Sequence, residues 1–412
     1  MNVIQWTITV AALGTAGSLA TGCGVDSPAP GPTCLAKTTL TAKAYTGDLR
    51  HRAYVASRDS GNVTVIDLDS LEIVASADTC SPGYHMVELS SDFSQAFASS
   101  PDKSKVDVLD ARTLGVTKQI EVAREPTHMS LSKDGKVLAV VAEKDNAVSF
   151  LDAASAIERK RLSGFYTPHF VRYAPDGRYA YVANLSAYHI TRVDLHTLSI
   201  DGHIALDGFD GPPHATEVTE PVGFADVQID ANGILWAAHG ESGRVLLYDT
   251  KTQTKLPEIT AGARPWIVYA EHPFVNIEAR VVPNHGDKSV SLLARVATTS
   301  MPASAVPTGE PESYGVNYSP LVPDKAFVMN RIRQEIAVIN TTTKARDAVI
   351  DVGGNTETAS TTADGRWIVA AVSSANRVVV IDAVTNAIVK TFDHVGNYPW
   401  TVTIPLGQNY CH

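Results

Sequence analysis

Seven of the thirteen histidines occupy positions in a repeated sequence pattern where their side chains could converge on a metal ion or a cofactor. Three of them stand at the start of short apolar, alternating stretches: His85 in GYHMV, His128 in PTHMS and His169 in TPHFV. The other four lie in polar turns or insertions: His214, His239, His285 and His394. Imidazole is the commonest metal-binding side chain and an axial ligand of haem. A converging set could therefore hold copper, iron or a tetrapyrrole, and the first three histidines are the candidates for a metal.

Aromatic and basic side chains accompany these histidines. Trp266 and Trp400 occupy the same position of the repeat as the histidines and could pack in the central channel or stack on a ligand. Four arginines could pair with carboxylates of a ligand: Arg124, Arg172, Arg264 and Arg331. A second interpretation stays open, because histidines at one repeat position can be inherited with the repeat and bond only to neighbouring loops. The sequence has no G-x-S-x-G, no H-E-x-x-H and no glycine-rich phosphate loop, so no catalytic residue is assigned.

The candidate residues are embedded in a repeat made of short strands. One strand of each repeat ends in aspartate or a substitute for it, as in VTVID (63–67), ITRVD (190–194) and VVVID (378–382). The closing positions are 67, 110, 152, 194, 249, 294, 340 and 382, so the steps between them run from 42 to 55 residues. A period in the low forties built from strands is typical of a β-propeller. We therefore predict an all-β, eight-bladed propeller, or a seven-bladed one if the degenerate stretch 266–306 forms no blade.

The two ends of the repeat region predict how the ring closes. The first repeat, RAYVASRDSGNVTVID (52–67), has no inner strand before it, and the last strand, PWTVTIPL (399–406), has no second strand after it. The C-terminal strand is therefore expected to complete the first blade, which leaves no open sheet edge at that point. Matching positions of adjacent blades then become neighbours around one axis. We expect the histidines to meet on the face where the inner strands begin, here called the top face.

The motif YVAN (181–184), with YVAS (54–57) and FVMN (327–330) as relatives, resembles the YVTN-repeat propellers. That WD40-like group is similar to the cytochrome d1-type haem propellers, and the resemblance covers about residues 48–406. It implies the propeller fold and a haem d1-like tetrapyrrole as one possible cofactor. The sequence contains no CxxCH motif, so no c-type haem is expected.

The amino terminus reads as an export signal. Residues 1–25 carry no charged side chain, and the apolar stretch ends in LATGC at Cys23, which resembles the lipobox of bacterial lipoproteins. The resemblance implies a signal peptide over 1–22, a lipid on Cys23, a flexible tether over 23–47 and the propeller over 48–412. Because no Lys or Arg precedes the apolar run, a plain secretory signal or an uncleaved anchor stays open. We expect an exported protein held at the bacterial cell envelope, on its periplasmic face or outer surface.

Charge and cysteines limit the partners. The net charge of −10 argues against nucleic acid, which requires a basic face. Strand direction places Cys34 and Cys411 on one side of the ring and Cys80 on the other, so a Cys34–Cys411 disulfide is predicted in the oxidising envelope.

Three classes of function follow from these features. The first is a monomeric, non-enzymatic binding or scaffold module whose top-face loops recognise a protein or a cell-envelope component. The second is a cofactor-binding or redox protein that uses the histidines for a metal or a d1-like haem. The third is a lactonase-like hydrolase, since some propellers of this repeat type cleave lactones. An enzyme is the less expected outcome.

Overall fold

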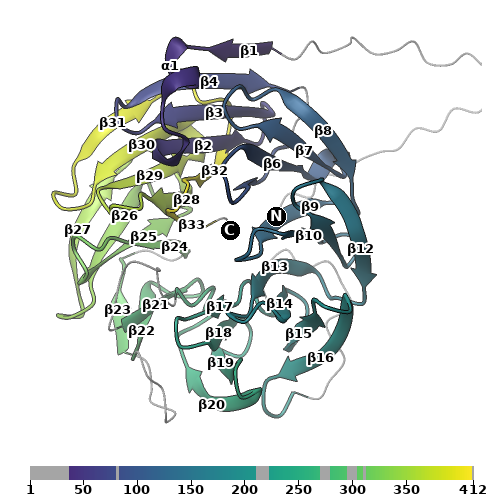
Figure 1. Cartoon of the computed structure of the whole chain (residues 1–412). Helices are drawn as coiled ribbons and strands as arrows, with labels where there is room; N and C mark the ends of the chain where they lie inside the picture. Colours follow the sequence, from purple (N-terminus) through teal and green to yellow (C-terminus); the bar gives the residue numbers. More distant parts are fainter. Residues whose placement is uncertain are drawn as a thin grey trace, which may run out of the picture. The chain divides into compact units, whose positions relative to one another are not determined.

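Eight antiparallel sheets follow one another along the chain and form the blades of a ring (Figure 1). The structure is a computed structural model that describes residues 37–79, 83–209, 222–269, 279–294, 304–309 and 312–410. The eight-bladed propeller predicted from the repeat is confirmed. Within the described segments, no helix has both the length and the apolar character needed to cross a membrane.

Blades 1 to 4 contain the following strands. Blade 1 consists of β1 (Lys37–Leu40), β2 (Arg52–Ser57), β3 (Asn62–Asp67), β4 (Glu72–Asp78) and β32 (Pro399–Thr403). Blade 2 consists of β5 (Val87–Leu89), β6 (Gln95–Ser100), β7 (Lys105–Asp110) and β8 (Val116–Glu121). Blade 3 consists of β9 (Pro126–Leu131), β10 (Val137–Ala142), β11 (Ala147–Asp152) and β12 (Ile157–Ser163). Blade 4 consists of β13 (Pro168–Tyr173), β14 (Tyr179–Asn184), β15 (His189–Asp194) and β16 (Ser199–Ala205).

Blades 5 to 8 and the short helices complete the described structure. Blade 5 consists of β17 (Gln228–Ile229), β18 (Ile234–His239), β19 (Arg244–Asp249) and β20 (Thr254–Thr260). Blade 6 consists of β21 (Ala279–Asn284), β22 (Ser289–Ala294) and β23 (Ser304–Pro307). Blade 7 consists of β24 (Ser313–Tyr318), β25 (Lys325–Asn330), β26 (Glu335–Asn340) and β27 (Ala345–Asp351). Blade 8 consists of β28 (Thr356–Thr361), β29 (Trp367–Val372), β30 (Arg377–Asp382), β31 (Ile388–Phe392) and β33 (Gln408–Asn409). The helices are α1 (Ala42–Thr46) and three 3₁₀ turns, Leu49–His51, Pro101–Lys103 and Ser373–Ala375.

The core lies between the faces of neighbouring blades. Every residue of β14 is buried, whereas β12 at the outer edge of its blade is mostly exposed. Tyr54 and Val65 of blade 1, for example, share one apolar cluster with Val87 and Leu109 of blade 2. Middle strands therefore carry apolar side chains on both faces, as strands buried on both sides do.

The closing aspartates of the repeat fix hairpins, as the sequence predicts. Asp110 accepts hydrogen bonds from the backbone N–H groups of Arg112 and Thr113 at 3.0 and 2.7 Å. Asp382 does the same with the two residues at matching offsets. Short polar side chains that bond to the backbone in this way stabilise turns.

The ring closes as predicted, by pairing of the C-terminal strand β32 with β2 (Figure 1). In the register, Tyr54 lies opposite Thr403 and Val55 opposite Val402. The stretch that decided between seven and eight blades forms blade 6, in which Pro265 and Tyr269 bridge to β21 as an irregular inner segment. The seven-bladed alternative is therefore wrong.

The predicted tether over residues 23–47 is too long at its C-terminal end. β1 pairs with the outer edge of β4, from Lys37 opposite Asp78 to Leu40 opposite Ala75. Helix α1 follows, and the buried guanidinium of Arg52 donates a 2.7 Å hydrogen bond to the Ala44 carbonyl. The outer edge of β4 offers unpaired backbone groups, and these stabilise residues 37–40 as a strand. The sequence around residues 37–40 is polar and turn-like, so it did not predict this strand. Residues 23–36 lie outside the described residues.

Side-chain hydrogen bonds and ion pairs join neighbouring blades. The Thr403 hydroxyl of blade 1 donates to the Val87 carbonyl of blade 2 at 2.6 Å. Between blades 5 and 6, Arg280 and Asp230 form a fully buried ion pair of 2.7 Å. These contacts hold the inner strands in fixed positions around the axis and so fix the side chains at their top ends.

Candidate metal centre

Three of the predicted histidines meet where the inner strands of blades 2, 3 and 4 begin. The Nε2 atoms of His85 and His128 are 3.4 Å apart, and the ring centroids of His128 and His169 are 4.2 Å apart. Their exposed fractions are 6%, 2% and 7%. Three buried imidazoles, of which His128 contacts both of the others, are the main feature of the site.

The three histidines do not occupy fully matching positions. Pro126 and Pro168 each pair with the last residue of the second strand of their blade. His169 follows its proline directly, whereas His128 follows Pro126 by two residues. The inner strands of both blades contain a register shift at this point, which lets the offset side chain of His128 reach its two neighbours. The expectation of strictly matching places is therefore wrong for His128.

Glu143 adds a carboxylate to the histidines. Potential ligand atoms of His128, Glu143 and His169 all lie within 4.8 Å of one another, and the Nδ1 atom of His128 is 3.9 Å from the Glu143 carboxylate. Sequence reasoning missed Glu143 because it searched this region for histidines. The available signal was its position directly after the second strand of blade 3, where the turn reaches the top face.

Hydrogen bonding sets the protonation of His169. Its Nδ1 atom lies 2.7 Å from the Ala225 carbonyl, which can only accept, so Nδ1 carries the proton and Nε2 keeps its lone pair. A metal-binding histidine is commonly held in this way through its other nitrogen. Burial lowers the pKa of His169 to about 4, and it lowers the pKa of His85 well below its ordinary value. Both imidazoles are therefore neutral at pH 7, the form that binds a metal.

Burial acts on Glu143 in the opposite sense. It raises the pKa of this carboxyl to about 7, although the Thr127 hydroxyl donates a 2.6 Å hydrogen bond to it. The carboxyl is thus close to half protonated at neutral pH, and a cation would favour its charged form.

Aromatic side chains complete a circle with the three histidines. The Trp400 ring lies 5.3 Å from His85, and the Trp266 ring lies 6.2 Å from His169. Tyr314 connects to Trp266 at 5.0 Å. Both indole Nε1 atoms are buried and have no hydrogen-bond partner among the described residues. The two tryptophans therefore flank the histidines.

Arg331 adds a guanidinium group to this circle, between Tyr314 and Trp400. Its guanidinium lies 3.6 Å from the centre of the Tyr314 ring and 5.6 Å from that of Trp400. Arg124 and Arg172, in contrast, are paired with Asp145 and Asp226. Of these three arginines, only Arg331 contacts Tyr314 and Trp400 among the described residues.

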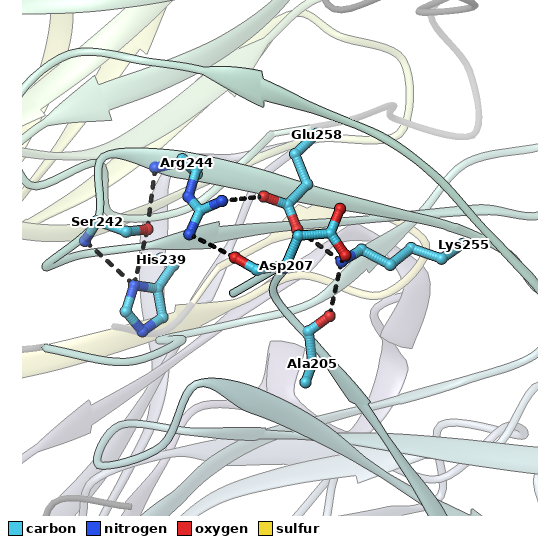
Figure 2. A network of polar contacts seen from close by, with 7 residues as sticks. All are labelled: Ala205, Asp207, His239, Ser242, Arg244, Lys255 and Glu258. Atoms are coloured by element: carbon cyan, nitrogen blue, oxygen red, sulfur yellow. Dashed lines mark hydrogen bonds and ion pairs between the residues drawn. The ribbon is translucent and has the colours of Figure 1, made fainter. Parts of the chain in front are cut away.

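The described contacts place the other predicted histidines apart from the three. His285 lies 3.4 Å from the Tyr314 hydroxyl, on the aromatic part of the circle. His239 bonds to Ser242 at 3.0 Å, beside the ion pair of Arg244 with Glu258, as Figure 2 shows. His394 is exposed. His214 lies outside the described residues, as do Cys23, Cys34, Cys80 and Cys411.

The geometry of the histidines and Glu143 matches a small cation. Two nitrogens bound to a tetrahedral zinc ion by bonds of about 2.0–2.1 Å are roughly 3.3–3.4 Å apart. The Nε2 atoms of His85 and His128 already have a separation of 3.4 Å. Imidazole with a carboxylate suits zinc, copper, iron or nickel. The arrangement is that of an eight-bladed propeller whose top face carries three buried histidines, two of which group with Glu143.

Comparisons with known proteins agree with this fold. A scan against protein families found no matching family, and a search of curated proteins found no match. Among solved structures, the dihydro-haem d1 dehydrogenase NirN in complex with DHE matches with a TM-score of 0.69 and 15% identity, over 87% of this chain and 76% of that one. Apo AztD from Citrobacter koseri matches with a TM-score of 0.60 and 13% identity, over 85% and 96%. Hydrazine synthase from Kuenenia stuttgartiensis matches with a TM-score of 0.54 and 18% identity, over 74% and 97%.

At these identities the similarity concerns the fold. A shared fold with a haem d1 dehydrogenase agrees with the predicted likeness to d1-type propellers. The YVTN-repeat and lipoprotein assignments stay predictions.

Proposed function

We propose that this protein binds one divalent transition-metal ion at the top face of its propeller. The ligands would be His85, His128, His169 and Glu143. The observation that carries the proposal is the contact of three buried imidazoles, two of them at the nitrogen separation of a tetrahedral site.

A small ion fits this cluster better than a tetrapyrrole does. The imidazole rings lie 4.2 and 4.8 Å apart between centroids, so a macrocycle has no room between them. Haem iron takes ligands along one axis, whereas ligand atoms of His128, Glu143 and His169 all lie within 4.8 Å of one another. The d1-like haem alternative is supported by the fold shared with NirN and not by this geometry.

Four protein donors also favour binding over catalysis. A tetrahedral ion with four protein ligands keeps no position for water, and catalytic zinc sites usually keep one. When bound, the metal would supply charge and coordination, and the chain's own residues would orient it. This argument weighs against the lactonase-like alternative. A protein that binds a metal ion reversibly can pass the ion to another molecule. The partner predicted at the cell envelope could be such a molecule.

Metal titration of the purified full-length chain tests the proposal. We expect one zinc or copper ion per chain by isothermal titration and metal analysis. His128→Ala and His169→Ala should each weaken binding by at least roughly a hundredfold, since loss of even an outer partner of a metal ligand costs tenfold to a hundredfold. His394→Ala is the matched control, because this exposed histidine lies apart from the cluster. Equal binding by wild type and His128→Ala would overturn the proposal, and a tetrapyrrole absorption spectrum would favour the haem alternative.

We further propose that the protein is exported and anchored by a lipid on Cys23, as LATGC implies. Metabolic labelling with a fatty-acid analogue should mark the wild type and leave Cys23→Ser unlabelled. Equal labelling of both would exclude this anchor, and equal membrane retention without a label would indicate an uncleaved segment.

A further inference from the structure

Two side-chain contacts join the inner strand of blade 4 to the inner segment of blade 5 beside the histidines. The Nδ1–H group of His169 donates a 2.7 Å hydrogen bond to the Ala225 carbonyl. Further along β13, a guanidinium nitrogen of Arg172 lies 3.0 Å from the Asp226 carboxylate. Ala225 and Asp226 are adjacent in the chain, so the ion pair acts on the same short stretch of backbone that holds His169.

The Asp226 carboxylate is fully buried, and donors on both blades bind it. One oxygen accepts from the backbone N–H of Val227 at 2.6 Å. The other oxygen accepts from the side-chain amide of Gln228 at 2.5 Å and from Arg172 at 3.0 Å. Such donors offset the cost of burying a charge. Because these partners belong to two blades, the carboxylate fixes the inner segment of blade 5 against β13.

Arg172 is itself held on the strand that carries His169. Its guanidinium lies 4.0 Å from the centre of the Phe170 ring, and Phe170 is buried. Phe170 directly follows His169 on β13. Planar guanidinium groups stack on aromatic rings while they bind a carboxylate, so the arginine has a defined place on this strand.

The backbone before Ala225 is attached to blade 4 as well. The N–H group of Gly223 donates a 2.7 Å hydrogen bond to the Leu185 carbonyl. A side chain at Gly223 would lie 2.3 Å from the Asn184 carbonyl oxygen, so this close approach requires glycine. The Ala225 carbonyl therefore lies between two attachments to blade 4, a backbone contact before it and the Asp226 carboxylate after it.

We propose that Asp226 is a positioning residue for the metal centre. Through its ion pair with Arg172 it holds the Ala225 carbonyl in place, and this carbonyl fixes the tautomer of His169. With the proton on Nδ1, the Nε2 atom keeps the lone pair that a metal requires. The effect on the metal rests on the proposed function, whereas the hold on His169 exists in the metal-free chain.

The tautomer of His169 is the direct readout, because a purely structural role of the ion pair would leave it unchanged. Metal-free full-length protein in EDTA at pH 7 is labelled with ¹⁵N-histidine, and long-range ¹H–¹⁵N spectra distinguish the two neutral tautomers. His169→Gln assigns the signal. We expect the Nδ1–H form alone in the wild type. Asp226→Asn keeps the size of the side chain but removes the charge that binds Arg172, so we expect it to add the Nε2–H form.

Zinc affinity measures the consequence for the metal. Loss of an outer partner of a metal ligand costs tenfold to a hundredfold, so Asp226→Asn should bind zinc at least about tenfold more weakly than the wild type in isothermal titrations. Arg172→Met removes the other partner of the ion pair from a partly exposed position and should change the tautomer in the same way. This second variant supplies the test if Asp226→Asn does not fold.

Asp230→Asn is the matched control. Asp230 is also a buried aspartate of blade 5, but it pairs with Arg280 of blade 6 at 2.7 Å and has no described contact with His169. This variant, or Arg280→Met if it does not fold, should keep the wild-type tautomer and zinc affinity. The same change of tautomer in the control would show a general loosening of blade 5 and would overturn the inference.

The remaining outcomes separate this inference from the metal proposal. A folded Asp226→Asn that keeps the Nδ1–H form alone overturns the positioning role, whatever its zinc affinity. A changed tautomer with an unchanged zinc affinity overturns the effect on the metal. A changed tautomer in a protein whose wild type binds no zinc overturns the metal function and leaves the hold on His169 standing.

Discussion

Opposite pH dependences of His169 and Glu143 give the sharpest prediction for the metal-free protein. The pKa of His169 falls from 6.5 to about 4 on folding, so the unfolded chain binds more protons in that window. Its contribution to stability is therefore lost as the pH falls from 6.5 towards 4. The pKa of Glu143 rises from 4.5 to about 7, so its contribution is present at low pH and is lost as the pH rises through 7.

The magnitudes follow from the two shifts. One pKa unit corresponds to about 1.4 kcal/mol. Between pH 7 and pH 5, His169 should lower the free energy of unfolding by about 2 kcal/mol, and Glu143 should raise it by about 2 kcal/mol. The two effects oppose each other in the wild type. On going from pH 7 to pH 5, the free energy of unfolding of His169→Gln should therefore rise by about 2 kcal/mol relative to that of the wild type. The free energy of unfolding of Glu143→Gln should fall by a similar amount relative to the wild type.

Urea unfolding in EDTA, followed by tryptophan fluorescence at pH 7, 6 and 5, measures these differences. Each variant is compared with the wild type at each pH. An effect of the substitution that does not depend on pH then cancels when the differences at pH 7 and pH 5 are subtracted. The pH dependence of stability that is due to His85 is the same in all of the proteins compared. Two variants that both follow the wild-type pH dependence would refute the reasoning. They would mean that the two side chains are solvated in the folded protein.

Four further predictions concern the site and the ring. Zinc affinity should fall about tenfold per pH unit below pH 7, because Glu143 must lose its proton to bind, and Glu143→Gln should flatten this slope in calorimetric titrations. Asp230→Ala should lower the free energy of unfolding by about 3–5 kcal/mol, since it leaves the buried Arg280 guanidinium without its carboxylate, and adding Arg280→Met should restore much of the loss in urea denaturation. Deleting the last fifteen residues should abolish cooperative thermal unfolding by circular dichroism, because the deletion removes β32 and opens blade 1; a cooperative transition in this variant would contradict the closure as a source of stability. Non-reducing peptide mapping should find a Cys34–Cys411 link, worth roughly 2–4 kcal/mol, and a link through Cys80 would show that the sides of the ring were assigned wrongly.

The architecture was accessible from the sequence because it depends on repetition. Eight strand-ending positions at regular intervals specify eight blades, and a missing inner strand at one end with a spare strand at the other specifies the closure. β1 was not accessible, because Lys37–Leu40 matches no repeat and forms only where the edge of β4 is available. Repeat patterns predict what recurs and do not predict an added edge strand.

The site was accessible only in part, since a repeat gives the position of a side chain but not its direction. The convergence of His85, His128 and His169 follows from adjacent blades. His239 also lies at a turn, but its nitrogen bonds to Ser242, a local contact that no spacing rule reveals. Glu143 was missed because only histidines were considered as ligands, although its position directly after β10 indicates the top face.

The closing strand gives the protein an order of assembly. β32 lies close to the end of the chain and carries Trp400, which contacts His85, Arg58 and Arg331. A chain that emerges from its amino terminus presents the three histidines long before this strand is available. The aromatic wall that Trp400 forms beside them can be completed only when the ring closes. Completion of the fold and completion of the proposed site are therefore one event, so a chain that lacks β32 cannot form the site as the closed ring does.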